Sequence, residues 1–339
     1  MGQPLAAVVV ASEGYIPTVI ATIMAQLYFL DNNTALLFSG QGSQYVGMGR
    51  SLYDANAAAR QVFDYADQVL GYALTEICFE GPEEMLRQTR YTQPALFVHE
   101  AAILAALGNF ACTAVAGHSL GEYTALYAAG VFSLEDALRL VSLRGELMYT
   151  AGIERPGAMA AIIGLDDSTV ESICREVAGT VVAANYNSPG QLVISGDSDV
   201  VRALLPRFKD AGARLITELP VSGAFHSPLM ASAREQLAEA INATTLYQPR
   251  CPVYMNASGL ATQSIDEIRL LLIEQLTAPV RWTNIMRSMY DNGIRRFVEI
   301  GPKNVLQGLV RRTLGKEVDV VGIDTYDDVE NLRHMLQLQ

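Results

Sequence analysis

A serine between two glycines is the most chemically informative feature of the sequence. Residues 117–121 read Gly-His-Ser-Leu-Gly, which fits the pattern G-x-S-x-G with Ser119 at its centre. In a nucleophile elbow, such a serine lies on a tight turn from a strand into a helix, which exposes its hydroxyl. The flanking Gly117 and Gly121 carry no side chain that would clash at the turn. A helix-capping serine is the alternative role.

The pattern around this motif is the one that a nucleophile elbow requires. Residues 113–116 form a short apolar run that predicts a strand, and the residues after Gly121 predict a helix that continues to Gly130. The amide groups at the start of that helix favour negative charge that develops on a substrate. We therefore predict that Ser119 is the nucleophile of an acyl transfer.

A serine nucleophile needs a base, and the sequence contains four histidines. His118 adjoins the serine, where a side chain usually faces away from the hydroxyl. His99 lies inside a predicted helix, and His334 lies in a C-terminal end that we expect to fray. His226 follows a predicted strand at a predicted domain junction, where loops often carry catalytic residues. From its position alone, His226 suits a structural role as well as a catalytic one.

Acyl transfer also needs hydrogen-bond donors for the oxyanion of its intermediate. The backbone N–H of Leu120, directly after the serine, is one candidate. The glycine-rich turn 39–44 follows the first predicted core strand, residues 35–38, and the N–H of Gln41 is the second candidate. The turn lacks the G-K-[ST] of a phosphate-binding loop, so we discount nucleotide binding. A plain tight turn is the other interpretation.

The elements that must position these residues alternate between apolar runs and amphipathic segments, which is typical of an α/β fold. Residues 155–223 instead follow the order strand-helix-strand-strand-helix-strand, the ferredoxin-like plan. We predict a large α/β-hydrolase-like domain with a parallel sheet, formed by residues 31–154 and 224–339, with this small domain inserted. Helices are expected at 54–70, 92–107, 134–149 and 228–241, and a strand at 296–300 with one final helix after it.

The composition limits the class of protein. Half of the 339 residues are hydrophobic and 18% are charged, which excludes intrinsic disorder. The net charge of −12 makes nucleic acid an unsuitable partner, because the field of the protein repels phosphate. The four cysteines are scattered and the histidines lack metal-ligand spacing. We therefore predict buried thiols in a reducing, cytoplasmic protein, and no metal site.

Residues 1–30 are unusually apolar. They contain no basic residue, so the positive region of a signal peptide is absent. Glu13 and Pro17 interrupt the apolar run and leave it shorter than the ~20 residues of a membrane span. An extension outside the fold, an added helix packed on the domain and a membrane element are the three interpretations. We expect the extension and no membrane association.

Nine segments, in order along the chain, resemble the malonyl-CoA:acyl carrier protein transacylase family of fatty acid synthesis and its polyketide acyltransferase relatives. Together they span residues 35–312. The matching segments are GQGSQYVGMG (40–49), TQPAL (92–96), GHSLGEYTAL (117–126), RGELM (144–148), GAMAAIIGLD (157–166), NYNSPGQLVISG (185–196), SGAFHSPLM (222–230), QLTAPVRWT (275–283) and EIGPKNVLQGL (299–309).

This resemblance implies a ping-pong transfer through a malonyl-serine intermediate. Ser119 would attack the thioester of malonyl-CoA with His226 as general base, and the phosphopantetheine thiol of acyl carrier protein would then take the malonyl group. The family orients this histidine with a backbone carbonyl, which corresponds to Gln275 here and need only fix the imidazole tautomer. The amides of Gln41 and Leu120 carry over as the oxyanion hole.

The resemblance also implies substrate-binding residues. Arg144 corresponds to the arginine that holds the free malonyl carboxylate, since a guanidinium offers two parallel hydrogen bonds. Phe225 resembles the malonyl-type relatives and not those that accept methylmalonyl, although a pocket distinguishes one methyl group by only ~1–3 kcal/mol. Asn185 and Asn187 correspond to residues that face the cleft and contact substrate or cofactor, while Asn187 also suits a turn.

Partners follow from the same resemblance. No cofactor is bound permanently, because malonyl-CoA is a substrate and acyl carrier protein brings its own phosphopantetheine. Carrier proteins are acidic, as this chain is, so we predict that Arg311 and Arg312 form a basic docking patch; solvated helix charges are the alternative. We expect a monomer. The chain departs from the family at Ser39, where proline is usual, and in its additional residues 1–30.

Two other functions use the same motif. A serine esterase or thioesterase would release the acyl group to water, and a trans-acting polyketide acyltransferase would deliver it to a different carrier. The missing acidic triad member and the match at Arg144 favour the transacylase.

Overall fold

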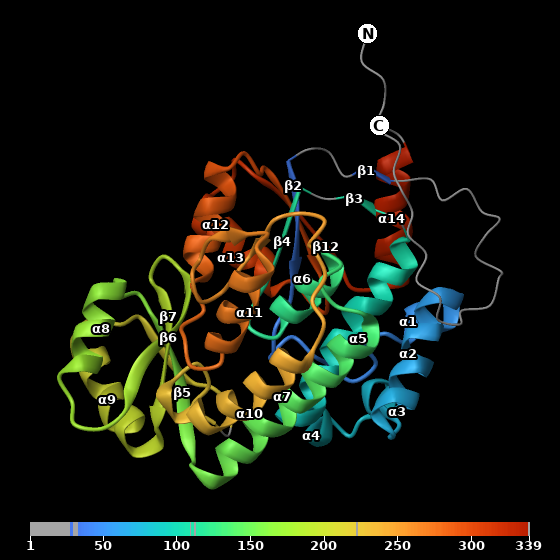
Figure 1. Ribbon diagram of the computed structural model, residues 1–339. Helices are drawn as coiled ribbons and strands as arrows, with labels where there is room; N and C mark the ends of the chain where they lie inside the picture. Colours follow the sequence, from blue (N-terminus) through green and yellow to red (C-terminus); the bar gives the residue numbers. More distant parts are fainter. Residues whose placement is uncertain (1–27, 30–32, 109, 112, 222, 338–339) are drawn as a thin grey trace.

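The computed structural model describes residues 28–29, 33–108, 110–111, 113–221 and 223–337. They form a six-stranded sheet covered by helices and, to one side of it, a four-stranded sheet with two helices of its own (Figure 1). The predicted N-terminal extension lies outside the described residues except for Tyr28–Phe29, so its three interpretations stay predictions. No described helix has both the length and the apolar character that crossing a membrane needs.

The six-stranded sheet has the order β10-β9-β4-β2-β11-β12 and is parallel except for the β10–β9 pair. All residues of β2 are buried, as expected for a strand inside a parallel sheet that is covered on both faces. A short β1 (Tyr28–Phe29) pairs in parallel with β3 (Phe110–Ala111) outside this sheet. The six strands are β2 (Thr34–Phe38), β4 (Ala114–Gly117), β9 (Val253–Tyr254), β10 (Ala261–Thr262), β11 (Arg296–Ile300) and β12 (Asp319–Ile323).

Helices cover both faces of this sheet because side chains alternate along its strands. Leu36 and Phe38 of β2 point into the larger core, whereas Ala35 and Leu37 point into a second core. The second core lies under α12 (Trp282–Asp291) and α13 (Val305–Leu314). The larger one packs against α1 (Arg50–Ala55), α2 (Ala57–Leu70), α3 (Leu74–Glu80), α4 (Glu83–Leu86), α5 (Thr89–Leu107), α6 (Gly121–Ala128), α7 (Leu134–Glu154), α10 (Ala231–Ala243), α11 (Ile265–Glu274) and α14 (Tyr326–Gln337).

The second sheet is antiparallel, in the order β6-β7-β5-β8. Its chain order is strand-helix-strand-strand-helix-strand, so the predicted ferredoxin-like plan is confirmed, while the predicted domain boundaries stay a prediction. Its helices pack on it around Ile162 and Ile194 in a separate core. The elements are β5 (Gly157–Ile163), α8 (Asp167–Arg175), β6 (Val181–Ser188), β7 (Gln191–Asp197), α9 (Ser198–Asp210) and β8 (Leu215–Glu218).

A backbone bridge joins β6 to Val280 in the loop before α12. The backbone N–H of Val280 donates to the carbonyl of Ala184 at 2.8 Å, and the N–H of Tyr186 donates to the carbonyl of Val280 at 2.9 Å. This bridge places the end of β6, including Asn185 and Asn187, beside the end of the parallel sheet.

Several local predictions were wrong. The helix expected at 134–149 continues to Glu154. The helix expected at 54–70 is two helices, because Asn56 adopts an extended conformation and caps α2 with its side chain. The helix expected at 92–107 begins earlier, at Thr89. The single helix expected after β11 is α13, β12 and α14, and α14 continues to Gln337, so the fraying expected at His334 is not observed.

Candidate active site

Ser119 lies on the sharp turn between β4 and α6. Its φ of 54° is in the left-handed region, a backbone conformation that residues other than glycine rarely adopt. The turn depends on contacts that only glycines permit. A Cβ at Gly117 would lie 1.8 Å from the carbonyl carbon of Gly121, and a Cβ at Gly121 would lie 2.2 Å from the carbonyl oxygen of Phe38. The geometry is therefore that of a nucleophile elbow.

His226 reaches this serine from the loop after β8. Its Nε2 lies 2.7 Å from Oγ of Ser119, and its Nδ1 lies 3.0 Å from the carbonyl oxygen of Gln275. A carbonyl can only accept, so Nδ1 carries the proton and Nε2 is left to accept from the hydroxyl. Burial, assisted by the charge of Arg144, lowers the pKa of His226 to about 3. The imidazole is therefore neutral and able to act as a base.

Arg144 on α7 is fully buried, and its guanidinium lies beside the nucleophile. Nη2 lies 3.1 Å from Oγ of Ser119 and 3.0 Å from Oε1 of Gln275. Nη1 donates to Oε1 of Gln93 at 2.7 Å. All of these partners are uncharged; the nearby carboxyl group of Glu122 attracts the guanidinium but, among the described residues, forms no ion pair with it. A buried cation of this kind favours a substrate with a carboxylate.

A cavity of about 90 Å³ opens beside these groups. It is small compared with the ~300–1,000 Å³ of pockets for drug-sized ligands, so it fits a short acyl group. Both sheets contribute to its walls. The lining residues are Gln41, Gln93, His118, Ser119, Leu120, Arg144 and Met148 from the larger unit, Met159, Asn185, Leu219 and Val221 from the smaller unit, and Phe225 and His226 from the loop between them.

The two predicted oxyanion-hole residues line this same cavity. Leu120 follows the nucleophile directly, and Gln41 lies on the turn after β2. That turn is pressed against the elbow, because a Cβ at Gly40 would lie 2.5 Å from the carbonyl oxygen of His118. The Gln41 side chain donates to Oγ1 of Thr89 at 3.1 Å, which holds the turn in place.

The smaller unit brings the predicted asparagines to the site. Nε2 of His118 lies 2.8 Å from Oδ1 of Asn187, and the His118 ring packs 5.4 Å from the ring of Trp282. His118 therefore contacts the smaller unit and not the serine hydroxyl. Asn185 lines the cavity, and its buried Oδ1 has no hydrogen-bond partner.

Sequence reasoning missed three buried polar residues around these groups. Gln93 holds Arg144, as described above. Oδ1 of Asn256 accepts the backbone N–H of Ser119, and the carboxylate of Glu122 accepts from Asn256 and Gln275. Gln93 and Glu122 lie inside segments that resemble the transacylase family, which is a signal that could have found them. Asn256 lies in no such segment.

The two predicted docking arginines are both exposed but contact different elements. Nη2 of Arg311 donates to the carbonyl of Val320 on β12 at 3.2 Å. Nη1 of Arg312 contacts Oε1 of Gln191, which pairs with Ser188 next to Asn187. Only Arg312 is therefore connected to the side of the molecule that carries the site. Among the described residues, no cluster of His, Cys, Asp and Glu could hold a metal ion.

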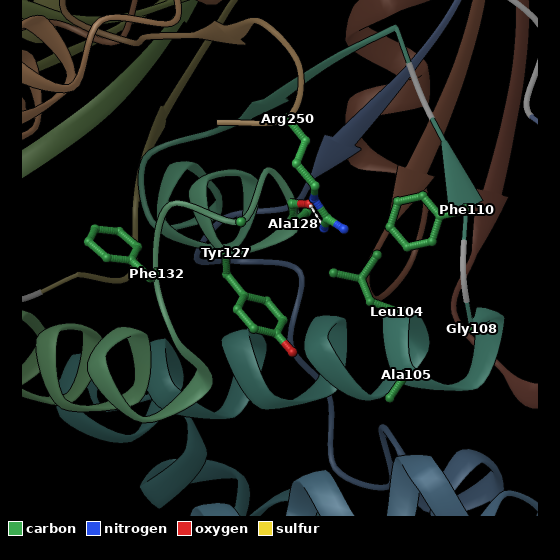
Figure 2. Close-up of a pocket in the computed structure, with 9 residues that line it drawn as sticks. Leu104, Ala105, Gly108, Phe110, Tyr127, Ala128, Phe132 and Arg250 are labelled. Carbon is green, nitrogen blue, oxygen red and sulfur yellow. Dashed lines mark hydrogen bonds between the residues drawn. The ribbon is translucent and has the colours of Figure 1, made fainter. Parts of the chain in front are cut away.

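A larger cavity of about 490 Å³ lies at the ends of α5 and α6 (Figure 2). The side chains of Leu104, Phe110 and Phe132 are among those that line it. Arg250 lies at its edge, and its Nη2 donates to the carbonyl of Ala128 at 2.8 Å. None of the predicted site residues lines this cavity.

Comparison with known proteins identifies the family. The sequence model of the acyl transferase domain matches residues 35–338. The chain belongs to this family. One similar acyltransferase is the malonyl CoA-acyl carrier protein transacylase of Staphylococcus aureus (strain MRSA252), which is 38% identical over 302 residues that cover 88% of this chain and 98% of that protein. The polyketide biosynthesis protein ThaF of Burkholderia thailandensis is 43% identical over 293 residues, which cover 85% of this chain and 25% of ThaF.

Solved structures of acyltransferases match the fold. The acyl carrier protein S-malonyltransferase of Vibrio cholerae has a TM-score of 0.84 and 39% identity, over 88% of this chain and 99% of that one. A malonyl-transacylase solved in complex with a type II polyketide synthase acyl carrier protein has a TM-score of 0.86 and 39% identity, over 91% of this chain and all of that one. The predicted fold class is confirmed, and the protein is an acyltransferase.

Proposed function

We propose that this acyltransferase moves a malonyl group from malonyl-CoA to the phosphopantetheine thiol of acyl carrier protein. The observation that carries the proposal is the buried guanidinium of Arg144, 3.1 Å from Oγ of Ser119. An acyl group attacked by Ser119 lies against this cation. A short acyl group with a free carboxylate close to its reacting carbonyl fits both the charge and the cavity, and malonyl is such a group.

Acylation follows from the geometry of the serine and the histidine. Nε2 of His226 takes the hydroxyl proton while Oγ of Ser119 attacks the thioester carbonyl. The oxyanion that forms lies at the backbone N–H groups of Gln41 and Leu120. When the intermediate collapses, the carbon–sulfur bond breaks and the imidazolium returns its proton to the CoA thiolate. The carbonyl of Gln275 stabilises the imidazolium at Nδ1.

The second half of the reaction uses the same groups with a different nucleophile. His226 takes the proton of the carrier's phosphopantetheine thiol, and the sulfur attacks the ester carbonyl of the malonyl-serine. Oγ of Ser119 then leaves and regains a proton. Transfer competes with hydrolysis, so water must be kept from the ester. The 90 Å³ cavity, bordered by Phe225, leaves little room for water beside a bound acyl group.

The malonyl preference and the carrier contact complete the proposal. Phe225 fills the position where a branched acyl group would place its additional methyl. Arg312, and less directly Arg311, supply positive charge for the acidic carrier on a chain whose net charge is −12. Asn185 offers an unpartnered acceptor to the substrate inside the cavity. Cytoplasmic localisation and a monomeric state stay predictions.

A trans-acting polyketide acyltransferase is the second candidate. The 43% identity to ThaF supports it, and so does the likeness to a transacylase in complex with a type II polyketide carrier. The chemistry at Ser119 is the same in both cases, and only the carrier differs.

The test is a loading assay with malonyl-CoA and acetyl-CoA, each with and without a carrier protein that bears phosphopantetheine. We expect malonyl-loaded carrier by intact mass, and a loss of at least ~10³-fold in Ser119→Ala. Arg144→Ala should lower malonyl transfer by ~10–100-fold and acetyl transfer far less, because it removes one charge-assisted contact.

Two outcomes of this assay contradict the proposal. Release of free malonate at the same rate with and without carrier would assign the protein as a thioesterase. An unchanged preference for malonyl over acetyl in Arg144→Ala would remove the guanidinium from acyl recognition.

A further inference from the structure

Glu122 is a buried carboxylate that the mechanism above does not use. It lies in the first turn of α6, is fully buried and does not line the cavity. Its Oε2 accepts the backbone N–H of Asn256, and its Oε1 accepts from Nε2 of Gln275 at 3.1 Å. The Asn256 partner is a backbone N–H, which can only donate, and the Gln275 amide donates as long as its oxygen faces Arg144, so both oxygens of Glu122 act as acceptors.

Through Asn256, Glu122 supports the nucleophile. The Asn256 side chain accepts the backbone N–H of Ser119 at 2.7 Å and donates to the carbonyl of Gly117 at 2.7 Å. These two bonds lie on either side of the strained turn and hold it. Because Glu122 accepts the backbone N–H of Asn256, it fixes the position from which the Asn256 side chain extends.

Through Gln275, Glu122 also supports the guanidinium. Oε1 of Gln275 accepts from Nη2 of Arg144 at 3.0 Å, while its Nε2 donates to Glu122 and, at 2.8 Å, to the carbonyl of Ser119. A side-chain amide has its oxygen on one side and its NH₂ group on the other. Acceptors that bind the NH₂ group therefore fix the direction in which the oxygen faces. The carboxylate of Glu122 is one of those two acceptors, so it sets the orientation of the Gln275 amide.

We propose that Glu122 is a positioning residue that sets the preference for an acyl group with a carboxylate, because it orients Gln275 against Arg144. This inference rests on the proposed malonyl transfer and adds to it the residue that controls acyl choice from outside the cavity. In Glu122→Gln, the new NH₂ group faces either Gln275 or Asn256, and both are donors. When the Gln275 amide rotates in response, its NH₂ group faces the guanidinium, and Arg144 loses the acceptor that holds Nη2 near Oγ of Ser119.

The test compares the kcat/KM of malonyl-CoA and acetyl-CoA for serine acylation in the wild type and in Glu122→Gln. We expect the ratio of malonyl to acetyl to fall by at least ~10-fold, because only malonyl uses the charge-assisted contact. If Glu122 had a purely structural role, the kcat/KM values of both substrates would fall by the same factor and their ratio would stay unchanged. That result would overturn the inference.

Glu100 on α5 offers a matched control. It is also fully buried, and burial raises the pKa of both carboxyl groups. At Glu122, the hydrogen bonds from Asn256 and Gln275 and the charge of Arg144 oppose this rise. Its partners are the hydroxyl groups of Ser39 and Thr124, which can donate as well as accept. Glu100→Gln therefore makes the same chemical change at a tolerant position, and we expect it to keep the wild-type ratio of malonyl to acetyl.

A second variant keeps the inference testable if Glu122→Gln does not fold. Gln275→Leu removes the amide but keeps the backbone carbonyl that orients His226. We expect the ratio of the malonyl to the acetyl kcat/KM to fall by at least ~10-fold, as in Glu122→Gln. In the double variant, Glu122→Gln should change the ratio no further, since its effect passes through the amide. A retained preference in Gln275→Leu, or a further loss in the double variant, would contradict the inference.

Failure of the inference is distinguishable from failure of the proposed function. If the wild type shows no preference for malonyl over acetyl, the proposed function is wrong. If the wild type prefers malonyl and Glu122→Gln prefers it equally, only the role of Glu122 is wrong.

Discussion

The two cavities described above lie at opposite ends of the parallel sheet. The larger one borders Phe110 and Arg250, which precede β4 and β9, so it lies at the amino ends of the strands. The smaller one borders Gln41 and Ser119, which follow β2 and β4, so it lies at the carboxyl ends. The chemistry is at the smaller cavity, where buried polar groups from several elements meet. Cavity volume is therefore a poor guide to function here.

The two ends also differ in how they make sharp turns. At the amino ends, the left-handed positions are occupied by glycine, at Gly108 with φ 78° and Gly130 with φ 82°. At the carboxyl ends, two such positions are occupied by Ser119 and His226. A side chain in this conformation costs of order 1–3 kcal/mol, and it persists only where the surroundings hold it. Two of the three described non-glycine residues in this conformation, Ser119 and His226, carry the reacting side chains, and Lys303 is the third.

The largest effect should come from crowding the elbow. Gly121→Ala would place a methyl group 2.2 Å from the carbonyl oxygen of Phe38, so the turn must shift. We expect malonyl transfer to fall at least ~10²-fold, because Ser119 and His226 lose their alignment. The matched control is Gly108→Ala at the amino ends, where a Cβ meets open space. The φ of 78° at Gly108 makes this substitution cost stability, but it moves no group of the active site. Steady-state assays should show near-wild-type malonyl transfer in that control. Equal rates of transfer in the two variants would contradict the difference between the amino and carboxyl ends of the sheet.

An intermediate effect should appear in the pH dependence of stability. His226 has a folded pKa of about 3, against 6.5 for an ordinary histidine. As the pH falls below 6.5, the unfolded chain takes up a proton at this residue and the folded protein does not, so stability decreases. The loss is ~2 kcal/mol at pH 5 and grows until the pH approaches the folded pKa.

Urea unfolding at pH 7 and pH 5 measures this loss. His226→Gln should lose less stability between the two pH values than the wild type does. His334→Gln changes an exposed histidine on α14 and should behave as the wild type. Identical losses in wild type and His226→Gln would show that the buried histidine does not carry this pH dependence.

The smallest effect should come from reversing a surface charge. Arg312→Glu should raise the KM for carrier protein by ~5-fold and leave the KM for malonyl-CoA unchanged, since exposed charge contacts contribute at most ~1 kcal/mol each. Arg250→Glu makes the same change at the other end of the sheet and should leave both KM values unchanged. Arg311→Glu should have the weaker effect of the two adjacent arginines, because Arg311 contacts β12. Equal effects at positions 250 and 312 would show that only total charge matters.

The sequence alone predicted the elements whose determinants are local. The elbow around Ser119 needs a strand, two glycines and a helix within a few residues, so its pattern was sufficient. His226 lies 107 residues away, and only the resemblance to a family distinguished it from a structural histidine. Gln275 orients His226 through its backbone carbonyl, which no residue type reveals. The edge strand β12 was missed because Ile323 is its only fully buried residue, which leaves a weak apolar pattern.

The contact between His226 and the backbone of Gln275 has an evolutionary consequence. A main-chain carbonyl is present whatever amino acid occupies position 275, so no single substitution there deletes the group that orients the base. The side chain at the same position hydrogen-bonds Arg144 and the carbonyl of Ser119. Substitutions at this position can therefore change which acyl donor is used while the carbonyl that orients His226 is kept. This makes the position a starting point for changing substrate choice by directed evolution.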